Sequence, residues 1–97
     1  MVLEVATITV TPGQEDAFLA SYQGVRHVIL AAEGCHRVRM TRGVESPSTF
    51  VLLVEWDSVE AHDENFRQTD LFGQWRGAIG PHFARAPHVE HYEDVDG

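Results

Sequence analysis

Four segments of the chain carry the residue pattern of β-strands. Val2–Val10 (VLEVATITV) is rich in β-branched residues and ends at a Thr-Pro-Gly turn signal. In Cys35–Gly43, successive side chains are expected to point to opposite faces of a strand, and one face holds His36, Val38 and Met40. Thr49–Asp57 (TFVLLVEWD) is almost wholly apolar, which is typical of a central strand covered on both sides. A last strand is expected over Val89–Val95, after an Ala-Pro pair.

Three helices are expected between these strands. Thr11 is a good N-cap, with Pro at the next position, so a long helix is predicted from about Pro12 to Ala32. Its apolar residues recur with helical spacing and form one stripe: Phe18, Tyr22, Val25, Val28 and Ile29. A short helix should begin after Asp57 or Ser58 and end near Arg67, and another should run from Thr69 or Asp70 to Ile79.

The order of these elements predicts the fold. A β-α-β-β-α-(α)-β order is typical of a ferredoxin-like α+β domain, in which helices cover one face of a four-stranded antiparallel sheet. The strand Thr49–Asp57 nevertheless places Phe50, Leu52, Val54 and Trp56 on one side and Val51 and Leu53 on the other. Both faces need cover, and the second is most simply covered by the sheet of another copy. We therefore expect a homodimer through the sheet faces.

Composition narrows the function classes. The 97 residues are expected to form one domain, 1–97, with 43% hydrophobic residues and a thin core. Fifteen acidic residues stand against seven Arg, giving a net charge of −8, so nucleic acid and anionic membrane surfaces are not expected partners. The longest apolar runs have about five residues, too few for a membrane span or signal peptide. A single cysteine, Cys35, forms no disulfide within the chain, and a cytoplasmic location is expected.

The whole chain resembles the antibiotic biosynthesis monooxygenase family of dimeric α+β barrels. The most specific stretch is Phe50–Ala61 (FVLLVEWDSVEA), which matches the family's strand, Trp, Ser and helix start. The other carriers are Thr7 to Glu15, Glu33-Gly34-Cys35, Thr69–Phe72, Trp75-Arg76 and Pro87–Tyr92. The resemblance implies a homodimer with a pocket between sheet and helices in each subunit. It says little about the reaction, because the fold hosts cofactor-free oxygenases, heme-degrading enzymes and proteins without known activity.

Two positions depart from the family pattern. Many relatives carry His in the short helix where this chain has Asn65. Heme-degrading relatives use an Asn, a Trp and a His at positions that here hold Ala6, Asn65 or Phe66, and Trp75 or Arg76. That triad is missing, so heme degradation ranks low.

Oxygenation without a cofactor makes two demands on a protein. Triplet O2 reacts poorly with closed-shell neutral molecules, so a base must first ionise a phenol- or quinol-type substrate. A dry apolar cage must then hold the radical pair. His62 and Asn65, at i and i+3 of the short helix, are the candidate base and hydrogen-bond donor. The candidate substrate-binding residues are Tyr22, Phe66, Phe72, Trp75, Arg76, Ile79, His82 and Phe83.

Each of these residues also has an ordinary structural interpretation. The aromatic residues can be core, and a helical His or Arg can be a surface residue. His88 and His91, at i and i+3 of a strand, point to opposite faces and predict no metal site, and both His91 and Tyr92 are expected at the sheet or dimer interface. The leading hypothesis is a cofactor-independent monooxygenase acting on a small electron-rich aromatic, with no flavin, heme or metal. The alternatives are a non-catalytic small-ligand-binding or structural dimer, and a heme- or polyketide-handling variant.

Overall fold

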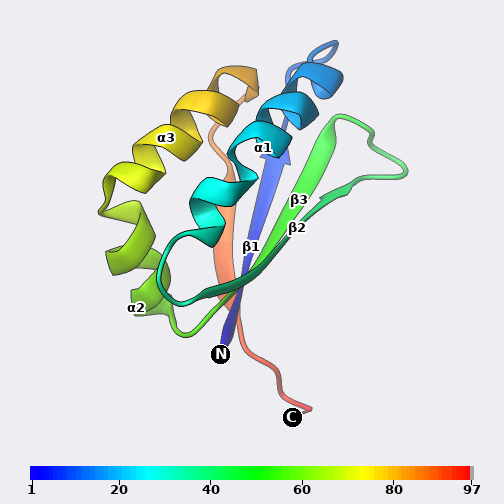
Figure 1. Ribbon diagram of the computed structural model, residues 1–97. Coiled ribbons are helices and arrows are strands. Elements are labelled where there is room, and N and C mark those ends of the chain that lie inside the picture. Colours follow the sequence, from blue (N-terminus) through cyan, green and yellow to red (C-terminus); the bar gives the residue numbers. More distant parts are fainter. Residues whose placement is uncertain (97) are drawn as a thin grey trace.

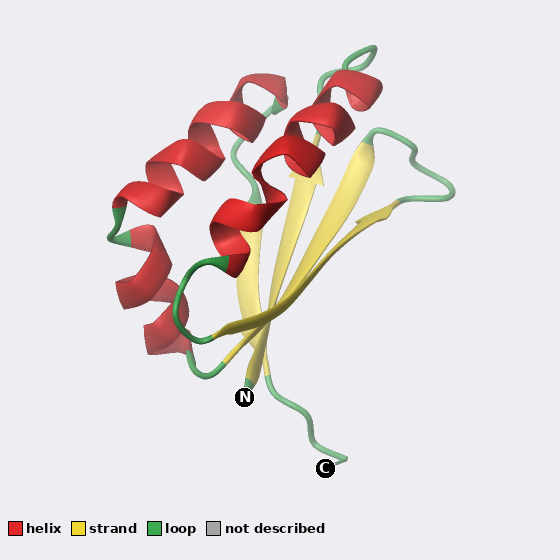
Figure 2. Ribbon diagram, in the orientation of Figure 1, coloured by secondary structure: helices red, strands yellow, loops and turns green. Residues whose placement is uncertain are grey.

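The computed structural model describes residues 1–96, and its elements follow the predicted order. The strands are β1 (Val2–Thr9), β2 (Cys35–Arg42), β3 (Thr49–Trp56) and β4 (His88–Tyr92), and the helices are α1 (Glu15–Leu30), α2 (Val59–His62), η1 (Asp63–Arg67), α3 (Asp70–Ile79) and η2 (Gly80–His82). The antiparallel sheet has the order β2-β3-β1-β4. Figures 1 and 2 show all the helices on one face of it, with the other face bare. The ferredoxin-like α+β fold is confirmed.

The first helix begins later than predicted. It starts at Glu15, and Gln14 occupies the N-cap position without a side-chain capping bond. Thr11, Pro12 and Gly13 instead form a turn, closed by a bond from the Gln14 amide to the Thr11 carbonyl. Gly13 has φ near +93°, which a helix does not accept, so the Pro at the expected first helical position belongs to the turn. The helix also ends at Leu30, two residues before the predicted end.

The strand boundaries differ from prediction mainly at the edges. β4 covers His88–Tyr92 rather than Val89–Val95, because its pairing with β1 ends at Leu3, near the start of that strand. A bulge lies between Cys35 and Arg37 in β2, and it turns His36 outward. His36 therefore bonds the Asp57 carboxylate at the surface instead of sharing the buried face of Val38.

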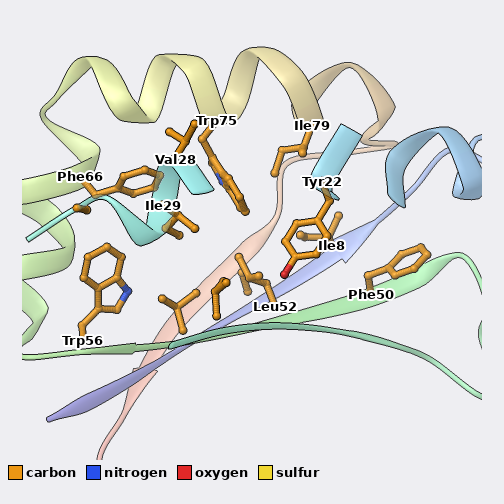
Figure 3. Packing of buried hydrophobic residues seen from close by; sticks show 14 of the residues in the cluster. Ile8, Tyr22, Val28, Ile29, Phe50, Leu52, Trp56, Phe66, Trp75 and Ile79 are labelled. Carbon is orange, nitrogen blue, oxygen red and sulfur yellow. The ribbon is translucent and has the colours of Figure 1, made fainter. Parts of the chain in front are cut away.

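The two faces of the central strands are covered unequally. Phe50, Leu52, Val54 and Trp56 of β3 are buried under the helices. Val51 and Leu53, between them, remain partly exposed on the opposite face. The helices pack their apolar stripes on the inner face only, as Figure 3 shows for the buried cluster beneath them.

The short helices α2, η1 and α3 form a layer on the sheet, which we call the short-helix layer, and it contains an irregular turn. Ser58 caps α2 by accepting a bond from the Ala61 amide, as predicted. After one turn the chain widens into the π-helical segment η1, which ends at Arg67. Thr69 then caps α3. His62 lies just before this π-helical segment and Phe66 lies within it, and both are buried. Such widened turns are often found at functional sites.

The longest helix, α1, has 16 residues. Within residues 1–96, the structure holds no helix that combines the length and apolar character needed to span a bilayer.

Candidate active site

A cavity of about 260 Å³ lies between the inner face of the sheet and the short-helix layer. Figure 3 shows Phe66 and Trp75 pointing from that layer toward the sheet. Its lining includes seven residues predicted from the sequence for the site: His62, Phe66, Phe72, Trp75, Arg76, Ile79 and Phe83. The strand residues Glu4, Ala6, Ile8 and Leu52 form its floor. The predicted position of the pocket therefore agrees with the structure.

Three predicted site residues lie outside this cavity and make structural contacts. The Asn65 side chain donates from Nδ2 to the Glu33 carbonyl at 2.8 Å, and so ties η1 to the loop after α1. Tyr22 is buried in α1 and meets the Trp75 ring edge-on. The His82 ring nitrogens lie 3.0 Å from Ser21 Oγ and 3.0 Å from Gln14 Oε1, which joins η2 to α1.

A buried chain of polar groups crosses the floor of the cavity. Trp56 Nε1 donates to Glu4 Oε1 at 2.9 Å. The same oxygen lies 3.3 Å from His62 Nε2. On the other side of the imidazole, His62 Nδ1 lies 2.8 Å from His91 Nε2. The sequence placed His91 at the sheet or the dimer interface, and the structure has it in strand β4 of the sheet, facing the helices.

Burial disfavours charge on both members of the Glu4–His62 pair. Glu4 is 5% exposed and His62 is 3% exposed. Loss of water raises the pKa of Glu4, while the bond from Trp56 and the positive charge of Arg67 oppose that rise. Burial first, and then the positive charges of His91 and Arg67, lower the pKa of His62 to about 4. His62 is therefore neutral at physiological pH.

One oxygen of this buried carboxylate remains open. Glu4 Oε1 takes both contacts, whereas Oε2 accepts no hydrogen bond from any residue in the range 1–96. Every fully buried side-chain nitrogen or oxygen of these residues has a hydrogen-bond partner, so Oε2 is not fully buried, and the Glu4 side chain lines the cavity. The site thus holds a carboxylate with one unpaired oxygen in the lining of a mostly apolar space.

Sequence reasoning missed Glu4, although a signal was present. In Val2–Val10, positions 4, 6, 8 and 10 fall on one face by alternation, and three of them are Ala, Ile and Val. A Glu on such a face is a buried charge, which proteins rarely keep without a partner or a function. Arg67 was also missed, because it lies at the end of a π-helical turn that a regular helical period does not describe.

No group of three or more potential ligand residues is arranged to hold a metal ion anywhere in the described range, 1–96. His88 and His91 do lie on opposite faces of β4, since His88 pairs with Glu90 on the outer side.

Comparisons with known proteins agree with this architecture. The family model described as "Antibiotic biosynthesis monooxygenase" matches residues 1–78. A solved structure from Bordetella bronchiseptica, named for that family, is 38% identical, with 97% of this chain and 96% of that chain aligned and a TM-score of 0.94. A Caulobacter crescentus structure, likewise named, is 25% identical over 97% and 89% of the two chains, with a TM-score of 0.82. The uncharacterized protein YczJ of Bacillus subtilis is 28% identical over 98% of this chain and its own full length. The chain belongs to the antibiotic biosynthesis monooxygenase family.

Proposed function

We propose that this protein oxidises a small electron-rich phenol with O2, without a flavin or metal. The observation that carries the proposal is the mostly apolar cavity with a buried carboxylate and imidazole on its floor. Those two features match the two demands of the reaction, a group that takes a proton and an enclosure with little water. The names of the Bordetella and Caulobacter relatives point in the same direction.

The chemistry balances without an external reductant. The phenol loses its hydroxyl proton, and the phenolate gives one electron to O2. The two radicals join at a ring carbon, and the resulting peroxide takes back a proton. Loss of water across the ring C–H and the O–O bond leaves a quinone, so one oxygen atom enters the product and the other leaves as water.

The cavity walls suit the radical stage. The aromatic rings of Phe66 and Trp75 meet at 6.2 Å between centroids, and Phe66 meets Phe72 at 5.6 Å, each nearly edge-on. Such rings provide apolar surface on which a planar substrate can pack. The guanidinium of Arg76 lies 5.2 Å above the Phe83 ring, where it gives the cavity one cationic border.

We also propose that the protein forms a homodimer through the outer face of the sheet. Leu3, Val5, Val51 and Leu53 lie side by side on β1 and β3 and are only partly covered. Proteins of this family typically form dimers. A second sheet packed on this face would remove that apolar area from water and complete a barrel.

The oxygenase proposal is tested with 1,5-dihydroxynaphthalene and labelled oxygen. Purified protein should consume one O2 per molecule of hydroxynaphthoquinone formed, with one 18O atom in the quinone and one in water. A reaction without protein corrects for autoxidation, and a chelator should leave the rate unchanged. Binding of the naphthalenediol without oxygen uptake above the autoxidation rate would instead support the alternative of a non-catalytic ligand-binding dimer.

A further inference from the structure

We propose that Glu4, and not His62, accepts the hydroxyl proton of the bound phenol, and that His62 positions the Glu4 carboxylate. This inference rests on the proposed function and names the group that would touch the substrate. It replaces the sequence-based expectation that the helical histidine is the base.

The first argument is that both nitrogens of His62 lie against other protein groups. Nε2 faces Glu4 Oε1 at 3.3 Å, and Nδ1 faces His91 Nε2 at 2.8 Å. The ring itself is stacked on Trp56, 4.9 Å between centroids with planes 21° apart, so a rotation of the ring would break these contacts. A base must come within hydrogen-bond distance of the proton that it removes, and each His62 nitrogen already has a protein atom within 3.3 Å.

The second argument is that Glu4 lines the cavity and has one oxygen without a hydrogen-bond partner. Its Oε1 is held by Trp56, beside His62, which fixes the plane of the carboxylate. Its Oε2 has no hydrogen-bond partner within residues 1–96, and the Glu4 side chain lines the cavity. A side chain this deeply buried, with one oxygen anchored and the other free, is preorganised to accept one hydrogen bond from a ligand.

The charged and titratable groups around Glu4 come from four elements. His62 of α2 lies 3.3 Å from Glu4 Oε1, His91 of β4 is hydrogen-bonded to His62, and Arg67 of η1 lowers the pKa of Glu4. Cys35 of β2 is close enough for the carboxylate to help raise the thiol pKa to about 11, after the larger effect of burial. Asp63 of η1 acts on His62 and favours its charged form. Burial outweighs the attractive contacts and raises the pKa of Glu4 toward the working pH, where a base is most effective.

The proton transfer is simple to write. The phenol O–H bond breaks, an O–H bond forms at Glu4 Oε2, and the electron pair stays on the phenolate oxygen. With Glu4 ionised, the favourable tautomer of His62 carries its proton on Nε2, beside Oε1, and accepts at Nδ1 from His91. The imidazole thus holds the carboxylate in place before and after it takes the proton, and Glu4 later returns that proton to the peroxide.

The test compares 2-naphthol with 2-methoxynaphthalene, which lacks the hydroxyl proton, in anaerobic binding titrations. The wild-type protein should bind 2-naphthol about 10-fold more tightly, the worth of one good hydrogen bond to a charged acceptor. Glu4→Gln should remove that preference. Trp56 Nε1 requires an acceptor, so the amide oxygen of Gln will take the Oε1 position and its NH2 will face the ligand, which offers the same donor to both probes.

Controls separate this inference from folding defects and from the oxygenase proposal. Glu64→Gln makes the same chemical change at an exposed position of η1 and should retain the preference. Equal wild-type affinities, failure of both probes to bind, or a preference that survives Glu4→Gln would overturn the inference. A preference that Glu4→Gln abolishes, in a protein that consumes no oxygen, would leave the Glu4 site standing and defeat only the oxygenase function.

The positioning role of His62 has its own readout. The preference for 2-naphthol should appear as pH rises through the pKa of Glu4, because protonated Glu4 can donate equally well to the ether oxygen. His62→Leu removes a donor to the carboxylate and should move that midpoint upward by about one pH unit. An unchanged midpoint in a folded variant would show that His62 does not act through Glu4.

Discussion

The two faces of strand β1 break the usual rule of polar outside and apolar inside, in opposite directions. Its inner face, under the helices, carries the buried carboxylate of Glu4. Its outer face carries Leu3 and Val5, which remain partly exposed. A buried charge costs free energy unless it is paired, and exposed apolar area costs free energy unless a partner covers it. Each face therefore keeps an unfavourable feature for which the isolated fold gives no reason.

The difference between the faces indicates what each one meets. Glu4 is held by Trp56 and His62, two residues from elements distant in sequence, so its position is specified by the tertiary fold. The outer apolar residues have no such specific contacts, and Val51 and Leu53 simply extend the patch onto the neighbouring strand. A directional polar group suits a small ligand, whereas a broad apolar patch suits a second sheet.

The inner face is tested most strongly by Glu4→Gln under turnover conditions. Loss of the proton acceptor should lower the oxygenation rate by about 10²–10⁴-fold, the range for a general base. Oxygen uptake with 1,5-dihydroxynaphthalene measures this rate. The difference in rate between Glu4→Gln and the wild type should be smaller for more acidic phenols, because they ionise without a base. Glu64→Gln is the control. An equal loss for every phenol would indicate a structural defect and not a lost base.

The outer face is tested by Leu53→Glu, which places a charge in the patch on both copies of the proposed dimer. Dissociation should become easier by about 100-fold or more, since two carboxylates would be buried in one apolar interface. Sedimentation velocity at micromolar concentration measures the change. Val44→Glu, in the exposed turn between β2 and β3, should leave the dimer intact. A wild-type protein that sediments as a 10.9 kDa monomer would contradict the dimer proposal.

The fold could be predicted from the sequence because the hydrophobic patterns and helix caps of the single elements agree with the overall topology. The apolar strand Thr49–Asp57, the helical stripe around Phe18 and the caps Ser58 and Thr69 each fix one element and point to one topology. The start of α1 was misplaced because Pro12 suits both a turn and a first helical turn. Only the positive φ of Gly13 decides between them, and the composition of the segment does not reveal it.

The residues of the site could be predicted only in part, because some of them come from segments that are distant in sequence. Helical spacing correctly grouped His62 with Phe66 and identified most of the apolar lining. The polar chain, however, joins β1, β3, α2 and β4, and no local period brings those segments together. Helical spacing also suggested that Asn65 shares the inward face, but η1 has a π-helical turn, and Asn65 bonds the Glu33 carbonyl instead.

Acid stability separates the two buried titratable groups of the inner face. The pKa of His62 falls from 6.5 to about 4 on folding, so the unfolded chain binds the proton first and stability declines as pH falls from about 6.5 to 4. The loss can reach about 3 kcal/mol at 1.36 kcal/mol per unit. The raised pKa of Glu4 affects stability in the opposite direction. It stabilises the fold below pH about 4.5, and this stabilisation is lost as pH rises through the pKa of Glu4 in the folded protein.

Urea unfolding at several pH values should therefore show that the free energy of unfolding falls less steeply below pH 6.5 for His62→Gln than for the wild type. Glu4→Gln should instead make the free energy of unfolding fall more steeply with decreasing pH. It removes the stabilisation that Glu4 adds at low pH, while the loss caused by His62 remains. His27→Gln, at an exposed position in the last turn of α1, is the matched control and should follow the wild type. Parallel curves for His62→Gln and the wild type would mean that His62 is not kept neutral by burial.

The smallest effect is expected from Asn65→Ala, at the edge of the inner layer. The substitution removes the bond from Nδ2 to the Glu33 carbonyl, an exposed contact worth about 1 kcal/mol of unfolding free energy. Because Asn65 does not line the cavity, oxygen uptake should change by less than about 3-fold, far less than for Glu4→Gln. Asn65→Asp, which keeps the size but cannot donate at that position, should lose similar stability. A rate loss of about 100-fold with unchanged stability would instead restore the sequence-based role of Asn65 as a donor to substrate, and would mean that η1 rearranges when a ligand enters.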